Sequence, residues 1–182
     1  LYHWDLPQIL QDEGGWAVRS TAYAFADYAK VCFEALGPYV DQWITLNEPF
    51  CAAYLGYLYG EHAPGIKNPQ KAFQAVHYLN LAHGLAVKEY RKSGLRVPIG
   101  TTLNPSLPRP ASRKAEDEKA ALYARSIFTD VFLYPLVGKG YPKEVTEDMH
   151  ISFPILDCDM EIIAQPIDFI GINYYMERAV VL

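Results

Sequence analysis

The sequence predicts an α/β fold with a parallel sheet, and three observations support this. Short apolar runs alternate with longer segments in which apolar residues recur at steps of three and four. Strands that alternate with helices in this way are typical of βα units. The apolar runs contain few polar residues, which indicates strands covered on both faces. Polar side chains collect just after the runs, at one end of the predicted strands.

The strands are predicted from runs rich in β-branched and aromatic residues. They cover residues 40–46, 97–103 and 167–172, and residues 1–3 are expected to form the tail of a strand that begins earlier. Asp168 lies at the beginning of the third run, so we expect it to serve the start of that strand rather than a site. The Tyr- and Gly-rich segment 52–65 predicts a structured loop with one short helix.

The helices are predicted from amphipathic periodicity and from end signals. The first spans residues 16–36 and ends at Gly37. The second has Asn68 as its N-cap and Pro69 in its first turn, and it ends at Gly94. A third begins at Ser112 with acidic residues in its early turns, and two short helices follow at 143–149 and 157–164.

Composition and charge disfavour several classes of protein. The 182 residues are 51% apolar and 20% charged, and the net charge of −5 with scattered basic residues disfavours a nucleic-acid partner. Cys32, Cys51 and Cys158 lack CxxC spacing and the five histidines lack an HExxH-like pattern, so we expect no disulfide framework, metal or other cofactor. No apolar run reaches the ~20 residues of a membrane span. The cysteines favour a reducing compartment, and we expect a cytoplasmic protein.

Several polar residues are expected to serve packing rather than chemistry. His83 lies on the apolar stripe of the second helix, which favours a hydrogen-bonded core residue over a ligand. His77 and His150 are expected to be surface or packing residues. Asp5 is expected to fix the loop that follows the first strand.

Polar residues follow every predicted strand. They are His3 and Trp4, Asn47 and Glu48, Asn104, and Asn173 with Tyr175. A (β/α)8 TIM barrel draws its active site from the carboxyl ends of many strands, whereas a doubly wound sheet gathers ligands at one switch point. The distribution therefore favours part of a TIM barrel over a doubly wound sheet.

Glu48 is the strongest candidate for chemistry at these strand ends. Asn47 places an amide beside its carboxyl group, and Pro49 sets the exit of the backbone. Aromatic residues lie close by in the sequence, namely Trp4, Trp43, Phe50, Tyr54, Tyr57 and Tyr59. Sugar rings present C–H faces to aromatic rings and hydroxyl groups to amides and carboxylates, so this composition favours a carbohydrate site.

Six motifs together resemble glycoside hydrolase family 1, the β-glucosidase and β-galactosidase type. They are HWDLPQ at 3–8, GGW at 14–16, TLNEP at 45–49, GEHAPG at 60–65, LAHGLAV at 81–87 and DFIGINYY at 168–175. They occur in the family's order over essentially the whole chain. The resemblance implies that residues 1–182 form one partial barrel domain with the family's strands three to six.

The resemblance also implies roles for single residues. Glu48 matches the general acid/base, Asn47 the amide that binds the sugar 2-hydroxyl, and Tyr175 the tyrosine that contacts the nucleophilic carboxylate. His3 and Trp4 match the glycone pocket, Asn173 is the neighbour of Tyr175 in its motif, and Phe50, His62 and Asn104 match the aglycone side. Many members have Trp at the position of Phe50, which implies a smaller aglycone platform here.

The family's nucleophile lies in an I/V-T-E-N-G motif that these residues do not contain. The remaining candidates, Glu61, Glu144, Glu161 and Glu177, have no motif support. A retaining mechanism needs two carboxyl groups about 5–5.5 Å apart. A complete barrel typically has about 250 residues. We therefore expect a fragment that is inactive alone.

The substrate is expected to be a small β-glycoside or oligosaccharide, and several alternatives stay open. Open sheet edges favour self-association, so one alternative is a half-barrel that assembles with a second copy. Another is a non-catalytic, sugar-binding or receptor-like relative. The sequence leaves the choice among glucoside, galactoside and 6-phospho-glycoside open, as it does the aglycone.

Overall fold

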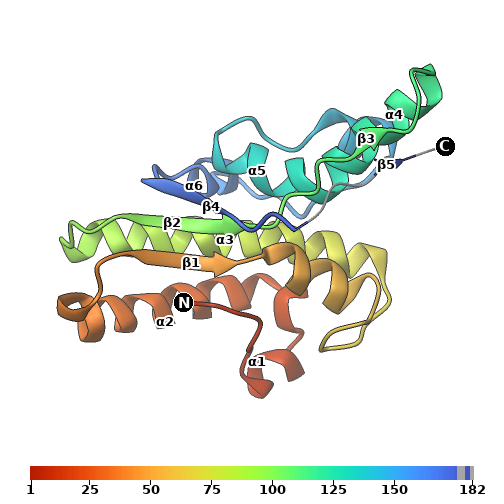
Figure 1. The fold of residues 1–182 in the computed structure, drawn as a ribbon. Coiled ribbons are helices and arrows are strands. Elements are labelled where there is room, and N and C mark those ends of the chain that lie inside the picture. Colours follow the sequence, from red (N-terminus) through yellow and green to blue (C-terminus); the bar gives the residue numbers. More distant parts are fainter. Residues whose placement is uncertain (176–178, 181–182) are drawn as a thin grey trace.

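The structure is a computed structural model that describes residues 1–175 and 179–180 (Figure 1). The α-helices are α1 (Gln8–Asp12), α2 (Arg19–Leu36), α3 (Pro69–Ser93), α4 (Ala115–Arg125), α5 (Val131–Leu136) and α6 (Asp159–Ile163). Short 3₁₀ turns cover Gly15–Ala17 and Gly37–Tyr39, and π-helical turns cover Cys51–Leu55, Ser126–Asp130 and Glu144–Asp148. The strands are β1 (Trp43–Asn47), β2 (Ile99–Leu103), β3 (Arg109–Pro110), β4 (Phe169–Ile172) and β5 (Ala179–Val180).

The predicted parallel sheet is confirmed. Its strands lie in the order β1, β2, β4, and both pairs are parallel. The N-terminal residues add to its free side, because Tyr2 forms a parallel bridge with Leu46 and its amide donates to the Thr45 carbonyl at 3.0 Å. Because all three strands run parallel, their carboxyl ends fall at the same edge of the sheet. The shorter β3 and β5 pair in parallel beyond that edge.

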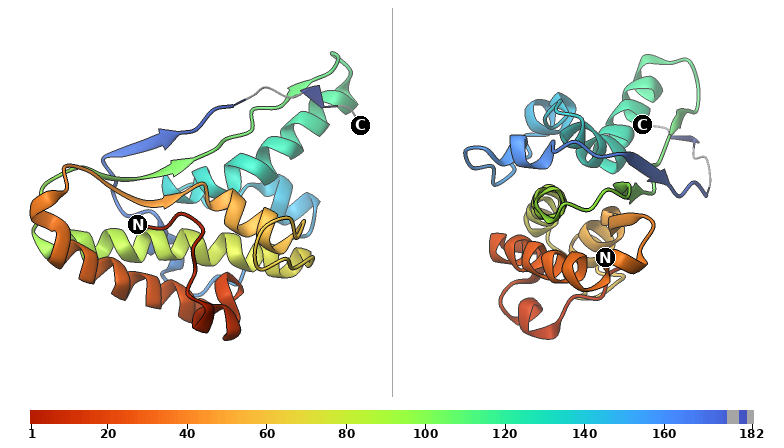
Figure 2. Two further views of the ribbon diagram at one scale, coloured as in Figure 1. Left: turned by 60° about the horizontal axis from the view of Figure 1, so that its bottom comes forward. Right: turned by 90° about the vertical axis from the view of Figure 1, so that its left-hand side faces the viewer.

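The prediction of strands covered on both faces is wrong for the described residues, because the helices cover one face of this sheet and leave the other uncovered (Figure 2). Trp43 points toward the helices, where its ring meets Phe33 of α2 at 4.9 Å between centroids. Ile44, the next residue along β1, is 37% exposed, and Ile172 of β4 is 57% exposed. The exposed apolar residues show that the described chain is an open sector of a barrel rather than a closed one.

Within the described residues no helix is long and apolar enough to span a membrane.

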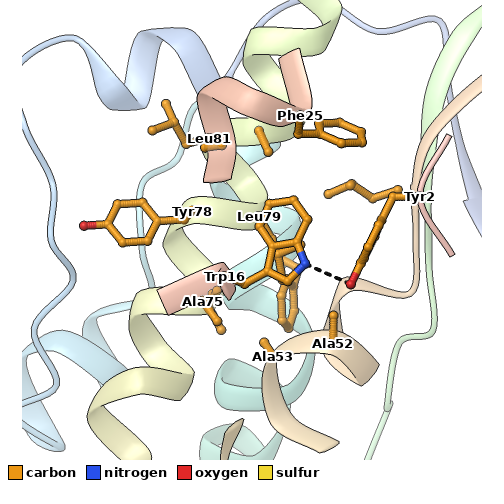
Figure 3. Packing of buried hydrophobic residues seen from close by; sticks show 14 of the residues in the cluster. Tyr2, Trp16, Phe25, Ala52, Ala53, Ala75, Tyr78, Leu79 and Leu81 are labelled. Carbon is orange, nitrogen blue, oxygen red and sulfur yellow. Dashed lines mark hydrogen bonds between the residues drawn. The ribbon is translucent and has the colours of Figure 1, made fainter. Parts of the chain in front are cut away.

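The GGW motif places Trp16 in the core between the sheet and the helices. Its indole nitrogen donates to the Tyr2 hydroxyl at 2.8 Å (Figure 3). The Trp16 amide donates to the Tyr57 hydroxyl at 2.9 Å. Gly15 has φ +60°, and a Cβ there would lie 2.2 Å from the Tyr57 oxygen. No larger residue fits that position, which accounts for a glycine directly before the buried indole.

Helix α3 has the ends that its sequence predicts and a close contact in its middle. Asn68 caps the N-terminus by accepting from the Lys71 amide at 3.0 Å, and Gly94 ends the helix in the left-handed region. A Cβ at Gly84 would lie 2.0 Å from the carbonyl oxygen of Ile162 in α6. The glycine of the LAHGLAV run therefore lets two backbones approach each other.

His83 is a core residue, as predicted. It is 1% exposed, and its Nδ1 lies 2.6 Å from the Thr45 hydroxyl. That hydroxyl can donate to the Gly100 carbonyl at 3.3 Å, so it accepts from His83 and places the ring proton on Nδ1. Burial lowers the pKa of His83 to about 4, which keeps the imidazole neutral at physiological pH.

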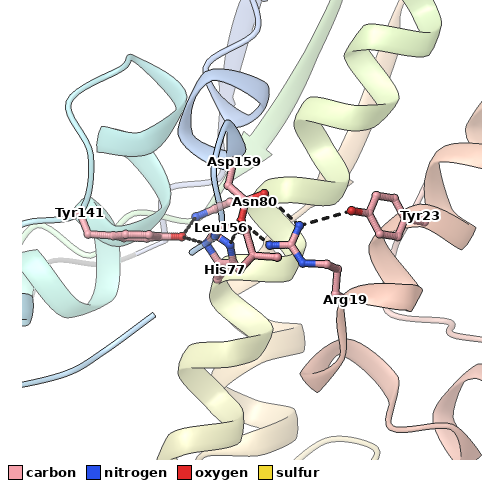
Figure 4. Close-up of polar contacts among 7 residues, drawn as sticks. All are labelled: Arg19, Tyr23, His77, Asn80, Tyr141, Leu156 and Asp159. Carbon is pink, nitrogen blue, oxygen red and sulfur yellow. Dashed lines mark hydrogen bonds and ion pairs between the residues drawn. The ribbon is translucent and has the colours of Figure 1, made fainter. Parts of the chain in front are cut away.

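A buried polar cluster joins α2, α3 and α6 (Figure 4). Asp159 is 2% exposed and accepts from the Arg19 guanidinium, the Leu156 amide and Nε2 of His77. The other nitrogen of His77 lies 2.9 Å from the Tyr141 hydroxyl, so His77 is a packing residue. Burial opposes the charge of Asp159, but hydrogen bonds from Arg19, Leu156 and His77 outweigh it and lower the pKa of the carboxyl.

Replacing Asp159 with Asn should destabilise the chain by about 3 kcal/mol, because the change leaves the partly buried Arg19 guanidinium without its buried counter-charge. Urea unfolding followed by circular dichroism measures this. Asp168→Asn is the matched control: Asp168 pairs with Arg91 at the surface, where both side chains are about two-fifths exposed, and should lose less than about 1 kcal/mol. The deficit of the Asp159 variant should shrink as the pH falls through the lowered pKa of Asp159, because the carboxyl of the unsubstituted chain is then as uncharged as the Asn amide. Equal losses from both variants would contradict this account.

Candidate active site

The backbone turns sharply where β1 delivers Glu48 to the edge of the sheet. Glu48 has φ +48°, and helical residues begin at Pro49, so strand and helix meet at this one residue. Its amide still donates to the Thr102 carbonyl at 2.9 Å. Trp4, after the first strand segment, also has a positive φ of +77°. Left-handed backbone at such residues costs on the order of 1–3 kcal/mol and clusters at functional sites.

The carboxyl group of Glu48 is buried and held on both oxygens. Oε1 accepts from the Asn173 amide at 2.6 Å and from the Tyr175 hydroxyl at 3.0 Å. Oε2 accepts from the Cys51 thiol at 3.3 Å. The Glu48 side chain is thus fixed by Asn173 and Tyr175, which follow β4, and by Cys51 in the first turn after β1. Glu48 is only 5% exposed. The carboxylate raises the pKa of Tyr175 by accepting its hydroxyl proton in a hydrogen bond.

Asn47 lies at the centre of a second group of contacts. Its side-chain oxygen accepts from Asn173 at 3.2 Å, and its amide nitrogen lies 3.2 Å from Nε2 of His3. The indole of Trp4 donates to the Asn47 carbonyl at 2.9 Å, and its ring lies near His3 and His62 with centroids 4.9 and 5.6 Å away. The residues predicted for the glycone pocket, His3 and Trp4, therefore contact Asn47, the residue directly before Glu48.

Two neighbouring cavities open at this edge. The one around Glu48 has a volume of about 550 Å³, and its lining includes Phe50, Cys51, Tyr59, Glu61, Asn104, Phe128, Asn173 and Tyr175. The other has a volume of about 530 Å³ and is lined by residues that include Trp4, Gln8 and His62. All nine predicted site residues thus lie at one edge, with Phe50 and Asn104 in the first cavity and His62 in the second.

Only some of the aromatic residues that lie near Glu48 in the sequence reach the site. Trp43 is 5% exposed and packs on α2, because it lies on the helix-facing side near the start of β1. Tyr54 and Tyr57 are also core residues, at 0% and 1% exposed. Tyr59 does line the cavity beside Glu48. Proximity in sequence therefore did not identify which aromatic rings reach the site.

Sequence reasoning missed two residues of the site, Cys51 and Phe128. Cys51, one helical turn after Glu48, touches the carboxyl group directly. Phe128 meets Phe50 with ring centroids 5.9 Å apart, although no sequence signal links them. Glu61, weighed as a second carboxyl group, does line the cavity of Glu48.

Other sequence alternatives lie elsewhere or stay untested. Glu144 lies 3.4 Å from the Ser126 hydroxyl, Glu161 is exposed on α6, and Glu177 is outside the described residues. The Tyr175 hydroxyl, expected on a second carboxylate, here contacts Glu48. Among the described residues no group of three or more His, Cys, Asp or Glu side chains is placed to hold a metal ion.

The fold and the site define an α/β chain of the TIM-barrel class that carries a buried carboxyl group at the carboxyl edge of its sheet. The chain belongs to glycosyl hydrolase family 1, whose model matches residues 1–181. It is 44% identical over 176 residues to a β-glucosidase of Agrobacterium sp., covering 96% of this chain and 38% of that protein.

Solved structures agree with this assignment. The AHE enzyme from Alicyclobacillus herbarius matches with a TM-score of 0.95 and 46% identity over 100% of this chain and 42% of that one. A β-glucosidase from Thermotoga maritima in complex with glucoimidazole matches with a TM-score of 0.94 and 43% identity, again over 100% of this chain and 42% of that one. The chain thus spans about two-fifths of the length of the relatives it matches.

Cys51 should resist alkylation in the folded chain. Burial, together with the hydrogen bond to Glu48, raises the pKa of its thiol to about 12, which leaves about a thousandth of the thiolate present in free cysteine. Exposed Cys158 is the internal comparison. Peptide mass spectrometry after timed iodoacetamide treatment should show Cys158 modified and Cys51 intact, and both modified after urea unfolding. Rapid native modification of Cys51 would contradict the buried placement.

Proposed function

We propose that this chain supplies the acid/base half of a retaining β-glycosidase site that acts on small β-glycosides or oligosaccharides. Glu48 donates a proton to the leaving oxygen and later takes one from water. The observation that carries the proposal is the buried Glu48 carboxyl at a left-handed turn, held by Asn173, Tyr175 and Cys51. Family membership and the β-glucosidase names of the relatives support the same reading.

The proposed chemistry assigns the neighbouring groups as follows. Asn47 binds the sugar 2-hydroxyl, a contact that strengthens in the oxocarbenium-like transition state. His3 and Trp4 bind the glycone, while Phe50, His62 and Asn104 face the leaving group. Asn173 and Tyr175 hold the carboxyl group of Glu48 in place.

A second carboxylate completes the proposed scheme. It attacks the anomeric carbon to form a glycosyl-enzyme, which water then hydrolyses with Glu48 as base. In the proposal this nucleophile comes from outside residues 1–182. The negative charge of the nucleophile favours the protonated form of the general acid, Glu48, before attack. Esterification removes that charge and lets Glu48 act as base.

We also propose that the protein works in the cytoplasm.

A chimera tests the role of Glu48. Residues 1–182 replace the matching segment of the Agrobacterium β-glucosidase, and hydrolysis of aryl β-glucosides is measured. Glu48→Ala should slow the reaction by about 10²–10⁴-fold with a poor leaving group and far less with dinitrophenolate, which departs without protonation. Added azide should then yield a β-glycosyl azide, because this nucleophile needs no general base.

Glu161→Gln is the matched control for that experiment, since Glu161 is an exposed carboxyl on α6. It should leave hydrolysis unchanged. Loss of activity that is independent of the leaving group, or full activity without Glu48, would overturn the assignment. A chimera that binds glucosides but never hydrolyses them would favour the non-catalytic, sugar-binding alternative.

The 182-residue chain alone should show no glycosidase turnover and should self-associate. One carboxylate cannot complete the retaining scheme, and the free edge of β4 and the exposed Ile44 and Ile172 favour pairing with another copy. Light scattering after size exclusion gives the mass, and an aryl β-glucoside assay gives the activity. Glu48-dependent turnover by a monomer would contradict both expectations, whereas turnover by a defined dimer would favour the half-barrel assembly.

A further inference from the structure

Cys51 is the described side chain that touches Oε2 of Glu48. It follows Glu48 by three residues, and the Cys51 amide donates to the Glu48 carbonyl at 2.9 Å, so the first helical turn aims the thiol back at the carboxyl group. The sulfur lies 3.3 Å from Oε2. On its other side the Asn104 amide donates to the sulfur at 3.6 Å. Cys51 is 6% exposed, so its contacts are with protein groups.

A thiol suits a carboxyl group that gains and loses a proton in each cycle. An S–H group is a weak donor and its sulfur is a weak acceptor. When Glu48 is ionised the thiol donates to Oε2. When Glu48 carries a proton on Oε2, that O–H group donates a hydrogen bond to the sulfur, and the other oxygen keeps its two donors. Both states therefore stay hydrogen-bonded without a rearrangement of the backbone.

We propose that Cys51 is a positioning residue for the acid/base reaction, a reversible hydrogen-bond partner that holds Oε2 of Glu48 in both protonation states and sets the pH at which the general acid loses its proton. The inference rests on the proposed function. The thiol itself takes no part in bond making, and its pKa of about 12 keeps it protonated throughout the working range.

Few other groups compete for this role. The titratable side chains that line the cavity with Glu48 and Cys51 are Tyr59, Glu61 and Tyr175. Tyr175 and the neutral amide of Asn173 occupy Oε1, and Glu61 is exposed to solvent. Cys51 can therefore be altered without removing the two donors to Oε1.

The test is the pH dependence of kcat/KM in the chimera, whose alkaline limb reports loss of the proton from the general acid. Cys51→Ala removes a donor to the ionised form, so the limb should move to higher pH by about half a unit. Cys51→Ser supplies a stronger donor, and the limb should move to lower pH by a similar amount. Cys158→Ser, at an exposed thiol, should leave the limb in place.

A packing role alone would lower activity in both variants without moving the limb, or would move it in the same direction in both. Either result overturns the proposal. The S–H stretching band of Cys51 in the 182-residue chain, identified by its loss in Cys51→Ala, gives a readout that needs no catalysis. The band should shift to lower frequency as the Glu48 carboxyl ionises, and its frequency should not change with pH in Glu48→Gln. A frequency that is independent of pH in the unsubstituted chain as well as in Glu48→Gln also overturns the proposal. An inactive parent chimera counts against the proposed function instead.

Discussion

The contact of Asn173 with Asn47, the last residue of β1, and with Glu48 directly after it sets the shape of the site. Adjacent strands lie about 4.8 Å apart, so β1 and β4, with β2 between them, are separated by about 10 Å. Yet the Asn173 amide reaches both Asn47 and Glu48, 126 and 125 residues earlier. The Asn and Glu side chains span this gap, and the curvature of a sheet that closes into a barrel shortens it.

The same edge holds backbone conformations that an unconstrained chain would avoid. Trp4 and Glu48 both have positive φ; Glu48 directly follows the paired Asn47, and Trp4 lies two residues after the paired Tyr2. The sheet fixes the residues before them, and helical or looped chain begins at once after them. Strain of this kind lets a strand end abruptly while its last side chain turns toward the cavity. The cost is local, and it is offset by the buried core beneath, where Trp16 and Tyr2 share a hydrogen bond.

Local patterns predicted the sheet, the main helices and the polar strand ends, because each depends on residues close in sequence. The strand predicted at 40–46 begins at Trp43 in the structure, since Asp41 and Gln42 are exposed in the preceding bend. What the patterns could not predict depends on packing between distant elements. Phe128 reaches the cavity only because a π-helical turn packs on Phe50, and Trp43 turns away from it because alternate residues of β1 face the helices.

The cluster around Asp159 has a consequence for how the chain folds. Arg19 and Asp159 are 140 residues apart, so their ion pair closes a loop that includes most of the molecule. Such a loop carries a large closure entropy, and contacts of this separation form after local helices and neighbouring strands. Interactions that form late act mainly on the unfolding rate. We therefore expect this cluster to slow the unfolding of the open sheet. An Asp159 variant should unfold faster, with little change in its folding rate.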